Sequence, residues 1–234
     1  MKVRPLGVVS RYSSIKHIQG SRMQSDDSMH PIQLCERFIT PYDQNDGLFV
    51  YAQEKLDGAN VGITLEHGRP IALTRAGYKA TGSNYLVHSQ FAKWVANCYI
   101  DFTDVISPGE ILRGEWLGYR HSLSYSLDSA RSPFYAFDIM HGKCHMPMAK
   151  FMLRCAGQQL LQTVPQVGNS LKGYGINFAS AWQEAKRLSL CESEPEGLVF
   201  RLESEDSVHE IGKWVRHDFV PGEYLKQDIK MWDL

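Results

Sequence analysis

An apolar run that ends in a short charged segment limits the folds open to this chain. Residues 48–52 form the run, which is typical of a buried β-strand, and Lys55 follows it within the segment 54–60. A lysine amine is a poor nucleophile while it is protonated, so a site that uses one must lower its pKa by burial and by nearby cations. The junction therefore predicts a lysine nucleophile at the end of a buried strand.

Lys55 belongs to a Lys-x-Asp-Gly tetrapeptide whose other residues suit the same chemistry. The small Gly58 lets a phosphate or a backbone come close, and Asp57 can orient a sugar hydroxyl or the lysine itself. So short a motif often occurs by chance, and a surface turn with a solvated lysine is the alternative interpretation. The motifs that follow it favour catalysis.

Five further motifs follow Lys55 in order along the chain. They lie at residues 74–77, 113–118, 134–139, 196–201 and 213–216. In this order and spacing, residues 50–216 resemble the covalent nucleotidyltransferases, the superfamily of ATP-dependent DNA and RNA ligases and mRNA capping enzymes. The resemblance is strongest to the RNA ligase branch, in particular its small phage and bacterial members, through segments 17–22, 54–60, 114–117 and 134–138.

The periodicity predicts an α+β fold of largely antiparallel sheets flanked by helices, and the resemblance implies the adenylation domain of that superfamily. Two or three strands are expected between residues 48 and 73, with a hairpin turn at 66–69. Further strands are expected at 109–117, at 133–140 and in the last two motifs.

Three helices are predicted, at residues 88–100, 149–162 and 178–190, with Asn177 as the N-cap of the last. In the first of them, apolar residues recur at helical spacing on one face, and we expect that face to be core rather than a stacking platform. These residues are Phe91, Trp94, Val95, Cys98 and Tyr99.

The expected organisation is a lead-in segment, residues 1–45, packed on a nucleotidyltransferase domain, residues 46–234. DNA ligases and capping enzymes append an oligonucleotide-binding barrel, which needs on the order of 70 to 100 residues. The sequence stops soon after the last motif, so no separate barrel is expected. This favours an RNA ligase over both alternatives.

The resemblance implies roles for residues in each motif. The catalytic set is Lys55, Asp57, Glu115, Glu196 and Lys213. The nucleotide-binding set is Glu54, Lys55, Gly58, Arg75, Glu115, Phe137, Glu196, Lys213 and Arg216. Glu115 is implied to contact the sugar and the lysine, and Glu196 to contact a hydrated metal ion.

Three of the implied roles have alternatives. Phe137 is assigned to stacking on adenine, with Tyr135 as the alternative, although any aromatic residue of such a strand can be core. Arg75 is assigned to the ribose or phosphates rather than to solvent. Many ligases have two lysines one residue apart in the last motif, whereas this chain has Lys213-Trp214-Val215. We therefore expect Lys213 to hold the α-phosphate and Arg216 to help at the triphosphate or at the nucleic-acid phosphate.

Contacts to a nucleic acid are expected in two places. Arg22 is a candidate in the N-terminal segment, where Arg11, Lys16 and His17 are also cationic or titratable, and His121 is a candidate after the Glu115 motif. Solvated loop cations are the alternative. The formal net charge of −1 argues against a general, tight nucleic-acid binder and requires only a local basic strip.

The predicted function is an ATP-dependent RNA ligase that uses ATP with Mg²⁺, or with Mn²⁺ as an alternative, and forms a lysyl-AMP at Lys55. The implied substrate is RNA with 5′-phosphate and 3′-hydroxyl ends, which an end-healing kinase and phosphatase partner can prepare. The alternatives are an ATP-dependent DNA ligase, a GTP-using capping guanylyltransferase, and a nucleotide-binding module without sealing activity.

The cellular setting follows from what the sequence contains. Its five cysteines are scattered, are odd in number and have no Cys-x-x-Cys spacing, which is typical of free thiols in a reducing cytoplasm. No run of 18 apolar residues and no signal-peptide pattern is present in the sequence. We therefore expect a cytoplasmic protein that does not contact a membrane.

Overall fold

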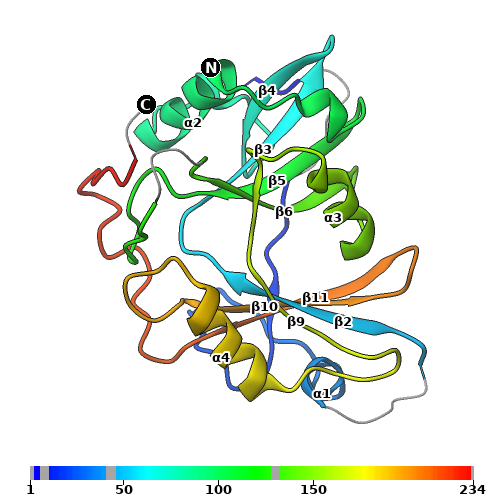
Figure 1. Ribbon diagram of the computed structural model, residues 1–234. Coiled ribbons are helices and arrows are strands. Elements are labelled where there is room, and N and C mark those ends of the chain that lie inside the picture. The colour runs from blue at the N-terminus through cyan, green and yellow to red at the C-terminus, as the bar shows by residue number, and fades with distance from the viewer. Residues whose placement is uncertain (1–2, 6–10, 41–45, 128–131, 233–234) are drawn as a thin grey trace. The chain divides into compact units, whose positions relative to one another are not determined.

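The computed structural model describes residues 3–5, 11–40, 46–127 and 132–232. The chain forms two compact units that alternate along the sequence, and Figure 1 labels their helices and strands. The first unit contains residues 1–13, 57–163 and 222–234, and the second contains residues 14–56 and 164–221. In the described part of the chain, no helix is both long and apolar enough to cross a membrane.

The first unit is built on a six-stranded sheet in the order β4-β3-β5-β6-β7, with β8 beside β6. Its strands are β3 (Ala59–Glu66), β4 (Arg69–Thr74), β5 (Glu110–Trp116), β6 (Phe134–His141), β7 (Cys144–His145) and β8 (Gln162–Thr163). All the pairs are antiparallel except that of β8 with β6. The turn between β3 and β4 has left-handed backbone at His67 (φ 52°) and Gly68 (φ 73°), which confirms the predicted hairpin and suits the twist of its strands.

One of the helices of the first unit packs on an aromatic core. The helices are α2 (Leu86–Asn97), α3 (Met148–Ala156) and two short 3₁₀ turns (Ala80–Gly82 and Phe102–Asp104). Phe91 and Trp94 of α2 pack on Phe134, with ring centroids 5.6 Å apart in both pairs, and on Trp116. This confirms the predicted core face of the helix at its centre.

Two predicted helix ends are wrong. The helix expected at 88–100 ends at Asn97 because the backbone of Cys98 is extended, so Tyr99 leaves the core face and is 94% exposed. The helix expected at 149–162 ends at Ala156, and Gln158 and Leu161 form a turn before β8. Helical spacing continued in both sequences beyond the point where the backbone leaves the helix.

The second unit is built on a five-stranded sheet in the order β1-β11-β10-β2-β9. Its strands are β1 (Lys16–His17), β2 (Phe49–Lys55), β9 (Gln166–Asn169), β10 (Gly197–Glu203) and β11 (Val208–Val215). The pair of β1 with β11 is parallel and the other pairs are antiparallel. These antiparallel sheets with flanking helices confirm the predicted α+β class.

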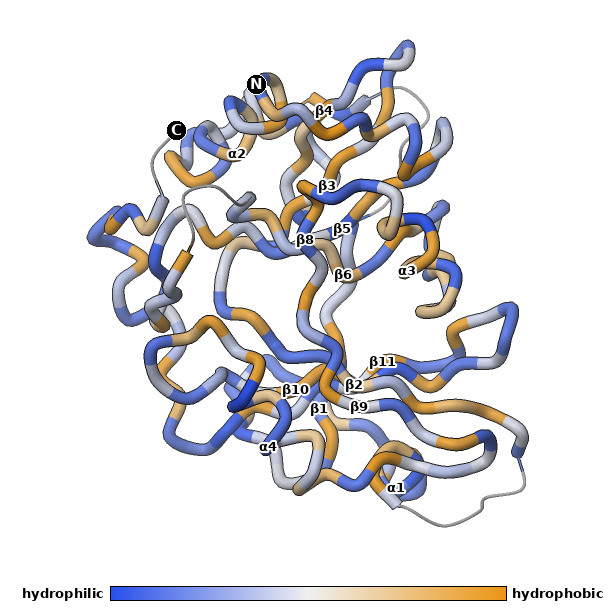
Figure 2. Tube along the Cα trace, viewed as in Figure 1, coloured by the Kyte–Doolittle hydropathy of each residue, from blue (hydrophilic) through white to orange (hydrophobic). Residues whose placement is uncertain are grey.

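Helices α1 (Ile32–Ile39) and α4 (Phe178–Leu188) cover one face of this sheet (Figure 1). Phe38 of α1 and Ala181 and Ala185 of α4 share a buried core with Ala52 of β2 and Phe200 of β10. Figure 2 shows hydrophobic and hydrophilic residues alternating along α4, as in a helix with one buried side. The side chain of Asn177 accepts a hydrogen bond from the Ser180 N–H (3.0 Å), which confirms the predicted N-cap. Helix α1 lies in the lead-in segment, for which no helix was predicted.

A glycine at the start of β10 is required by the close approach of β11. A Cβ atom on Gly197 would lie 1.9 Å from the backbone oxygen of Trp214. We expect Gly197→Ala to lower the free energy of unfolding by at least about 3 kcal/mol, because a backbone atom cannot move aside as a side chain can. Urea titration measures this free energy.

Gly157→Ala is the matched control for that variant. A Cβ atom on Gly157 meets nothing within 4 Å, and its backbone is right-handed. This control should change the free energy of unfolding by less than about 1 kcal/mol. A Gly197→Ala protein as stable as the control would show that the strands separate at little cost.

Candidate active site

Lys55 is the last residue of β2, and an ion pair fixes its side chain. Its Nζ donates a hydrogen bond to Oε2 of Glu196, at 2.7 Å. Side chains alternate along a strand, and Val50 and Ala52 face the helix-covered core, so Lys55 lies on the opposite face. Glu196 directly precedes β10, whose first residue, Gly197, is paired with Lys55. The second unit therefore brings together two of the predicted catalytic residues.

The ion pair is accessible to a small molecule and yet constrained. The Lys55 side chain is 25% exposed and that of Glu196 is 8% exposed. A carboxylate at this distance keeps the amine in one direction and can accept a proton from it. Since an amine attacks only after it has lost a proton, this arrangement suits a nucleophilic lysine.

Glu54 precedes Lys55 and faces the other way. It lies on the helix-covered side of β2, where its Oε1 accepts a hydrogen bond from the Ser189 hydroxyl at 2.5 Å. Its Oε2 is buried and has no hydrogen-bond partner among the described residues. Burial raises the pKa of this carboxyl group to about 7, although the bond from Ser189 acts against the change. Its predicted contact with a nucleotide stays a prediction.

The buried carboxyl group of Glu54 predicts a pH-dependent stability. An acid whose pKa is raised on folding, here from 4.5 to about 7, takes up a proton on folding between these values. Below pH 4.5 the carboxyl group is protonated in both the folded and the unfolded state and costs no stability, and stability is lost as the pH rises from 4.5 to about 7. Relative to wild type, Glu54→Gln should gain up to about 3 kcal/mol in free energy of unfolding between pH 4 and pH 8.

Urea titrations of both proteins at the two pH values measure this gain. The exposed Glu192 supplies the control variant, Glu192→Gln, which should differ from wild type by the same amount at both pH values. A Glu54→Gln protein that behaves like this control would mean that Glu54 is ionised and solvated in the folded protein.

Lys213 and Arg216 also lie in the second unit, and both are paired. The Nζ atom of Lys213 donates to Oδ1 of Asp27 at 3.1 Å. Arg216 follows β11, donates from Nε to the backbone oxygen of Pro195 (3.0 Å) and lies 2.7 Å from Asp218 through Nη1.

Strand register places Lys213 on the same sheet face as Lys55. Val199 of β10 is paired with Gln53 of β2 on one side and with Lys213 of β11 on the other. Lys55 is two residues beyond Gln53 on β2, so it lies on the same face. Neighbouring strands are about 4.8 Å apart, so two intervening spacings put the backbones of β2 and β11 about 10 Å apart. One phosphate chain can span that distance.

Asp57 and Gly58 lie in the first unit, where each makes a specific contact. The Oδ2 atom of Asp57 accepts hydrogen bonds from the backbone N–H groups of Ser122 (2.7 Å) and Leu123 (2.9 Å). The Gly58 N–H donates to Oε1 of Glu115 at 3.2 Å. A Cβ atom on Gly58 would lie 2.6 Å from the backbone oxygen of Trp116. The motif glycine thus permits the close approach of β5.

Arg75 and Phe137 lie in the first unit and share a neighbour, Tyr12. Arg75 donates from Nε to the backbone oxygen of Tyr12 at 3.3 Å. The rings of Tyr12 and Phe137 meet edge to face with centroids 5.3 Å apart. Phe137 is partly exposed, whereas Tyr135 is buried. Of the two aromatic candidates, Phe137 is the more accessible to a base.

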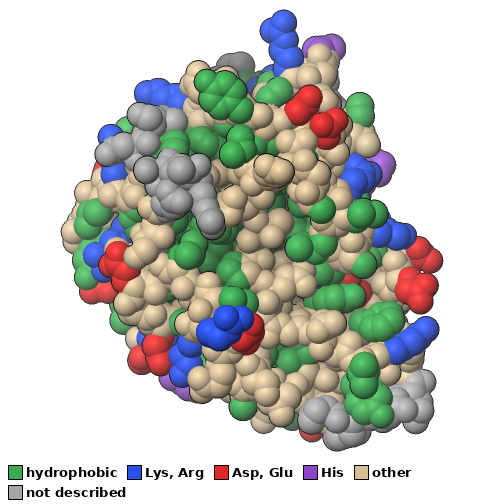
Figure 3. Space-filling view, viewed as in Figure 1, with side chains coloured by type: hydrophobic (Ala, Val, Ile, Leu, Met, Phe, Trp, Pro, Cys, Tyr) green, Lys and Arg blue, Asp and Glu red, His purple; other side chains and the backbone are tan. Residues whose placement is uncertain are grey.

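The two substrate candidates are in different units. Arg22 lies beside β11 in the second unit, where its N–H donates to the backbone oxygen of Val215 at 2.9 Å. His121 lies in the first unit, where its backbone oxygen accepts from the Tyr224 N–H at 2.7 Å. On the face shown in Figure 3, basic and acidic side chains are interspersed rather than gathered in one broad patch.

Sequence reasoning missed the residues that support the site. Ser122, Leu123 and Tyr125 fix Asp57, Ser189 contacts Glu54, and Asp27 contacts Lys213. Each partner is far from its target along the chain and is of an ordinary type. A single sequence carries no signal of these pairings.

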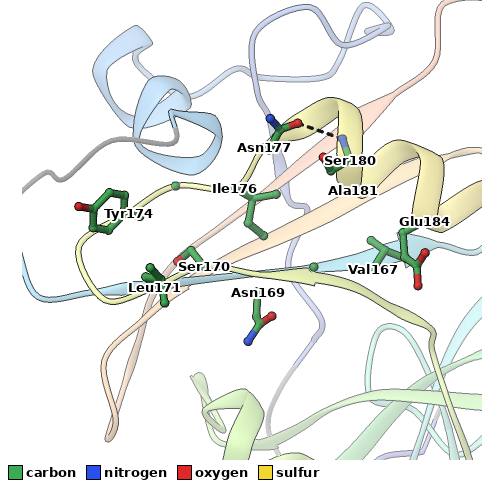
Figure 4. A pocket seen from close by; sticks show the side chains of 12 residues that line it. Val167, Asn169, Ser170, Leu171, Tyr174, Ile176, Asn177, Ser180, Ala181 and Glu184 are labelled. Carbon is green, nitrogen blue, oxygen red and sulfur yellow. Dashed lines mark hydrogen bonds between the residues drawn. The ribbon is translucent and has the colours of Figure 1, made fainter.

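A hollow of about 460 Å³ lies elsewhere in the second unit, between β9 and the start of α4. Figure 4 shows Ser170, Asn177, Ser180 and Glu184 around it, together with apolar residues that include Val167, Leu171 and Ile176. Glu184 is the charged residue in its described lining, and that lining contains no lysine or arginine. The hollow therefore lacks the positive charge that a triphosphate needs.

Comparison with known proteins gives one family and several similar folds. The model of the RNA ligase family matches residues 48–215. A candidate ATP-dependent DNA ligase of Aquifex aeolicus is 18% identical, with 88% of this chain and 49% of that one covered and a TM-score of 0.56. A Naegleria gruberi RNA ligase with pyrophosphate is 15% identical, with 97% and 60% covered and a TM-score of 0.51.

An archaeal ATP-dependent RNA ligase is 17% identical, with 92% of this chain and 47% of that one covered and a TM-score of 0.48. No curated protein sequence matches the chain. At these identities the first two structures show a shared fold. The chain spans 47% to 60% of the length of the three proteins.

Proposed function

Because the chain belongs to the RNA ligase family, whose model matches residues 48–215, we propose that it is an ATP-dependent RNA ligase that carries AMP on Lys55. The observation that carries this proposal is the 2.7 Å contact of Lys55 Nζ with Glu196, where β2 ends beside the start of its neighbour β10. A carboxylate at this distance can orient the proposed lysine nucleophile and accept its proton, which supports the proposal.

The reaction has three steps. The Lys55 amine attacks the α-phosphorus of ATP, so that a P–N bond forms, the bond to the β-phosphate oxygen breaks and pyrophosphate leaves with the loss of one amine proton. A 5′-phosphate oxygen of RNA then attacks the same phosphorus and releases Lys55. The RNA 3′-hydroxyl finally attacks the activated 5′-phosphate, forms a 3′–5′ phosphodiester and expels AMP.

The other predicted residues also have roles in this scheme. Lys213 contacts the α-phosphate and Arg216 the remaining phosphates, because charge neutralisation carries much of phosphoryl-transfer catalysis. Glu115 and Arg75 contact the ribose, and Phe137 stacks on the adenine. Asp57 holds the 122–123 backbone, and its hydrogen bonds there support a positioning role.

Glu196 is the carboxylate that would hold Mg²⁺. In the described part of the chain no three His, Cys, Asp or Glu side chains form a metal site. A single carboxylate nevertheless suits Mg²⁺, which keeps several waters and binds through one or two carboxylates plus substrate phosphates. When bound, the ion neutralises negative charge that develops on the phosphates.

The proposed substrate is RNA with a 5′-phosphate and a 3′-hydroxyl, in the cytoplasm. Arg22 and His121 are the candidate contacts to its backbone, and a kinase and phosphatase partner would prepare ends that lack these groups. The formal net charge of −1 favours recognition of an end over tight binding along a strand.

Label transfer tests the proposal. Purified protein is incubated with Mg²⁺ and α-labelled ATP or GTP, and the label that remains on the denatured chain is counted. Label from ATP is expected, followed by its loss when RNA with a 5′-phosphate is added, and the same RNA with a 5′-hydroxyl is the matched control.

Other outcomes identify the alternatives. Label from GTP alone indicates a capping guanylyltransferase, and sealing of all-DNA nicks in preference to RNA indicates a DNA ligase. No label from either nucleotide, on protein whose intact mass excludes bound AMP, leaves a nucleotide-binding module.

A further inference from the structure

The N-terminal segment 16–30 is attached along the strand that carries Lys213. Strand β1 pairs with β11 so that His17 lies opposite Lys213. The Ile18 N–H donates to the backbone oxygen of Lys213 (2.9 Å), and the indole N–H of Trp214 donates to the backbone oxygen of Gly20 (2.8 Å). This segment therefore holds β11 both at the backbone of Lys213 and at the side chain of the next residue, Trp214.

Asp27, in the same segment, fixes the side chain of Lys213. Its Oδ1 accepts from Lys213 Nζ at 3.1 Å, while its Oδ2 accepts from the Gln24 N–H at 2.9 Å. Burial raises the pKa of Asp27, but the bonds from Gln24 and Lys213 outweigh this and lower the pKa to about 2. Asp27 is therefore a carboxylate with a fixed direction at neutral pH.

His17 is the third member of the group. Its Nε2 lies 3.0 Å from Oδ2 of Asp27, in a close contact that is not aligned as a hydrogen bond. Its Nδ1 lies 2.5 Å from the hydroxyl of Ser21, which in turn accepts from the Val215 N–H. Burial lowers the pKa of His17, and the charges of Lys213 and Lys55 add to this effect. His17 therefore packs against the carboxylate as a buried ring.

We propose that Asp27 is a positioning residue that aims the Lys213 amine at the α-phosphate during the transfer of AMP to Lys55, which makes Asp27 part of the active site. This inference rests on the proposed function. A lysine side chain has many rotamers, and fixing it before the substrate binds removes that entropy cost from the reaction. The ammonium has three N–H donors, so the bond to Asp27 leaves two for a phosphate.

A double-mutant cycle tests whether Asp27 acts through Lys213. The rate of lysyl-AMP formation at saturating ATP is measured for wild type, Asp27→Ala, Lys213→Ala and the double variant. We expect Asp27→Ala to lower the rate about 10-fold or more and Lys213→Ala to lower it about 100-fold. The double variant should be no slower than Lys213→Ala.

Two further variants separate positioning from a loss of structure. Asp27→Asn keeps an oxygen that can accept from Lys213, so it should recover part of the rate that Asp27→Ala loses. Asp26→Ala removes the same charge from the exposed neighbouring residue and should match wild type. Two results would overturn the proposal. One is a double variant in which the rate losses of Asp27→Ala and Lys213→Ala multiply, and the other is an Asp27→Ala protein with the wild-type rate.

Amine reactivity gives a measurement that does not depend on ligase activity. Trace acetylation followed by mass spectrometry reports how readily each lysine reacts, and Lys213 should react several-fold faster in Asp27→Ala than in wild type. If the wild type never takes label from ATP but this difference is found, the pairing stands and the proposed function fails. If ATP labels the wild type and neither rate nor reactivity changes in Asp27→Ala, the positioning role fails alone.

Discussion

Lys55→Ala is expected to abolish the covalent AMP adduct, lowering the rate of its formation by at least about 10⁴-fold. The amine at the end of β2 is the atom that forms the P–N bond in the proposed reaction, and alanine offers no substitute. The measurement is label from α-labelled ATP on the denatured chain, followed over time.

Lys55→Arg is the sharper variant. Arginine keeps the positive charge beside Glu196 but remains protonated at any usable pH, so it cannot attack phosphorus. It should therefore keep the wild-type free energy of unfolding to within about 1 kcal/mol and still form no adduct. Lys93→Ala, in an exposed position of α2, should be labelled as wild type is. Persistent label on Lys55→Arg would place the nucleophile elsewhere.

Glu196→Ala is expected to lower the same rate by about 100-fold to 1000-fold. The change removes the carboxylate that contacts Lys55 Nζ at 2.7 Å and the proposed ligand for Mg²⁺. Both losses act on the first step, so the adduct should form slowly even at saturating ATP.

Titration with Mg²⁺ distinguishes the two roles of Glu196. Glu196→Gln keeps an oxygen that can accept from Lys55 but loses the negative charge, so it should need more Mg²⁺ for half-maximal rate than wild type. Glu194→Gln, two residues away and exposed, is the matched control and should show the wild-type rate and Mg²⁺ dependence. A Glu196→Ala protein as fast as that control would remove Glu196 from the site.

The parts of the fold that follow from local pattern were predictable. The apolar run before Lys55 does form a strand, the turn at 66–69 does form a hairpin, and Asn177 does cap a helix. Each depends on residues close together in sequence, where period, turn chemistry and capping act.

The supporting contacts depend on residues that are distant in sequence. Asp57 is held by the backbone of Ser122 and Leu123, and Lys213 by Asp27. Almost every residue has a backbone N–H group, and single carboxylates are common, so the sequence does not indicate which of them contacts a site residue. Strand alternation explains the opposite directions of Glu54 and Lys55, but both were predicted to contact the nucleotide. The covered face is set by α4 together with α1, for which no helix was predicted.

The strand order of the second unit also constrains when its sheet can form during synthesis of the chain. Strand β2 is made early, but its neighbours β9 and β10 are residues 166–169 and 197–203, and β1 must wait for β11, which ends at Val215. Long waits between pairing partners slow folding and leave apolar strands exposed to aggregation. A nascent chain released before residue 208 would thus contain Lys55 and Glu196 but not β11, the strand that carries Lys213 and pairs with β1.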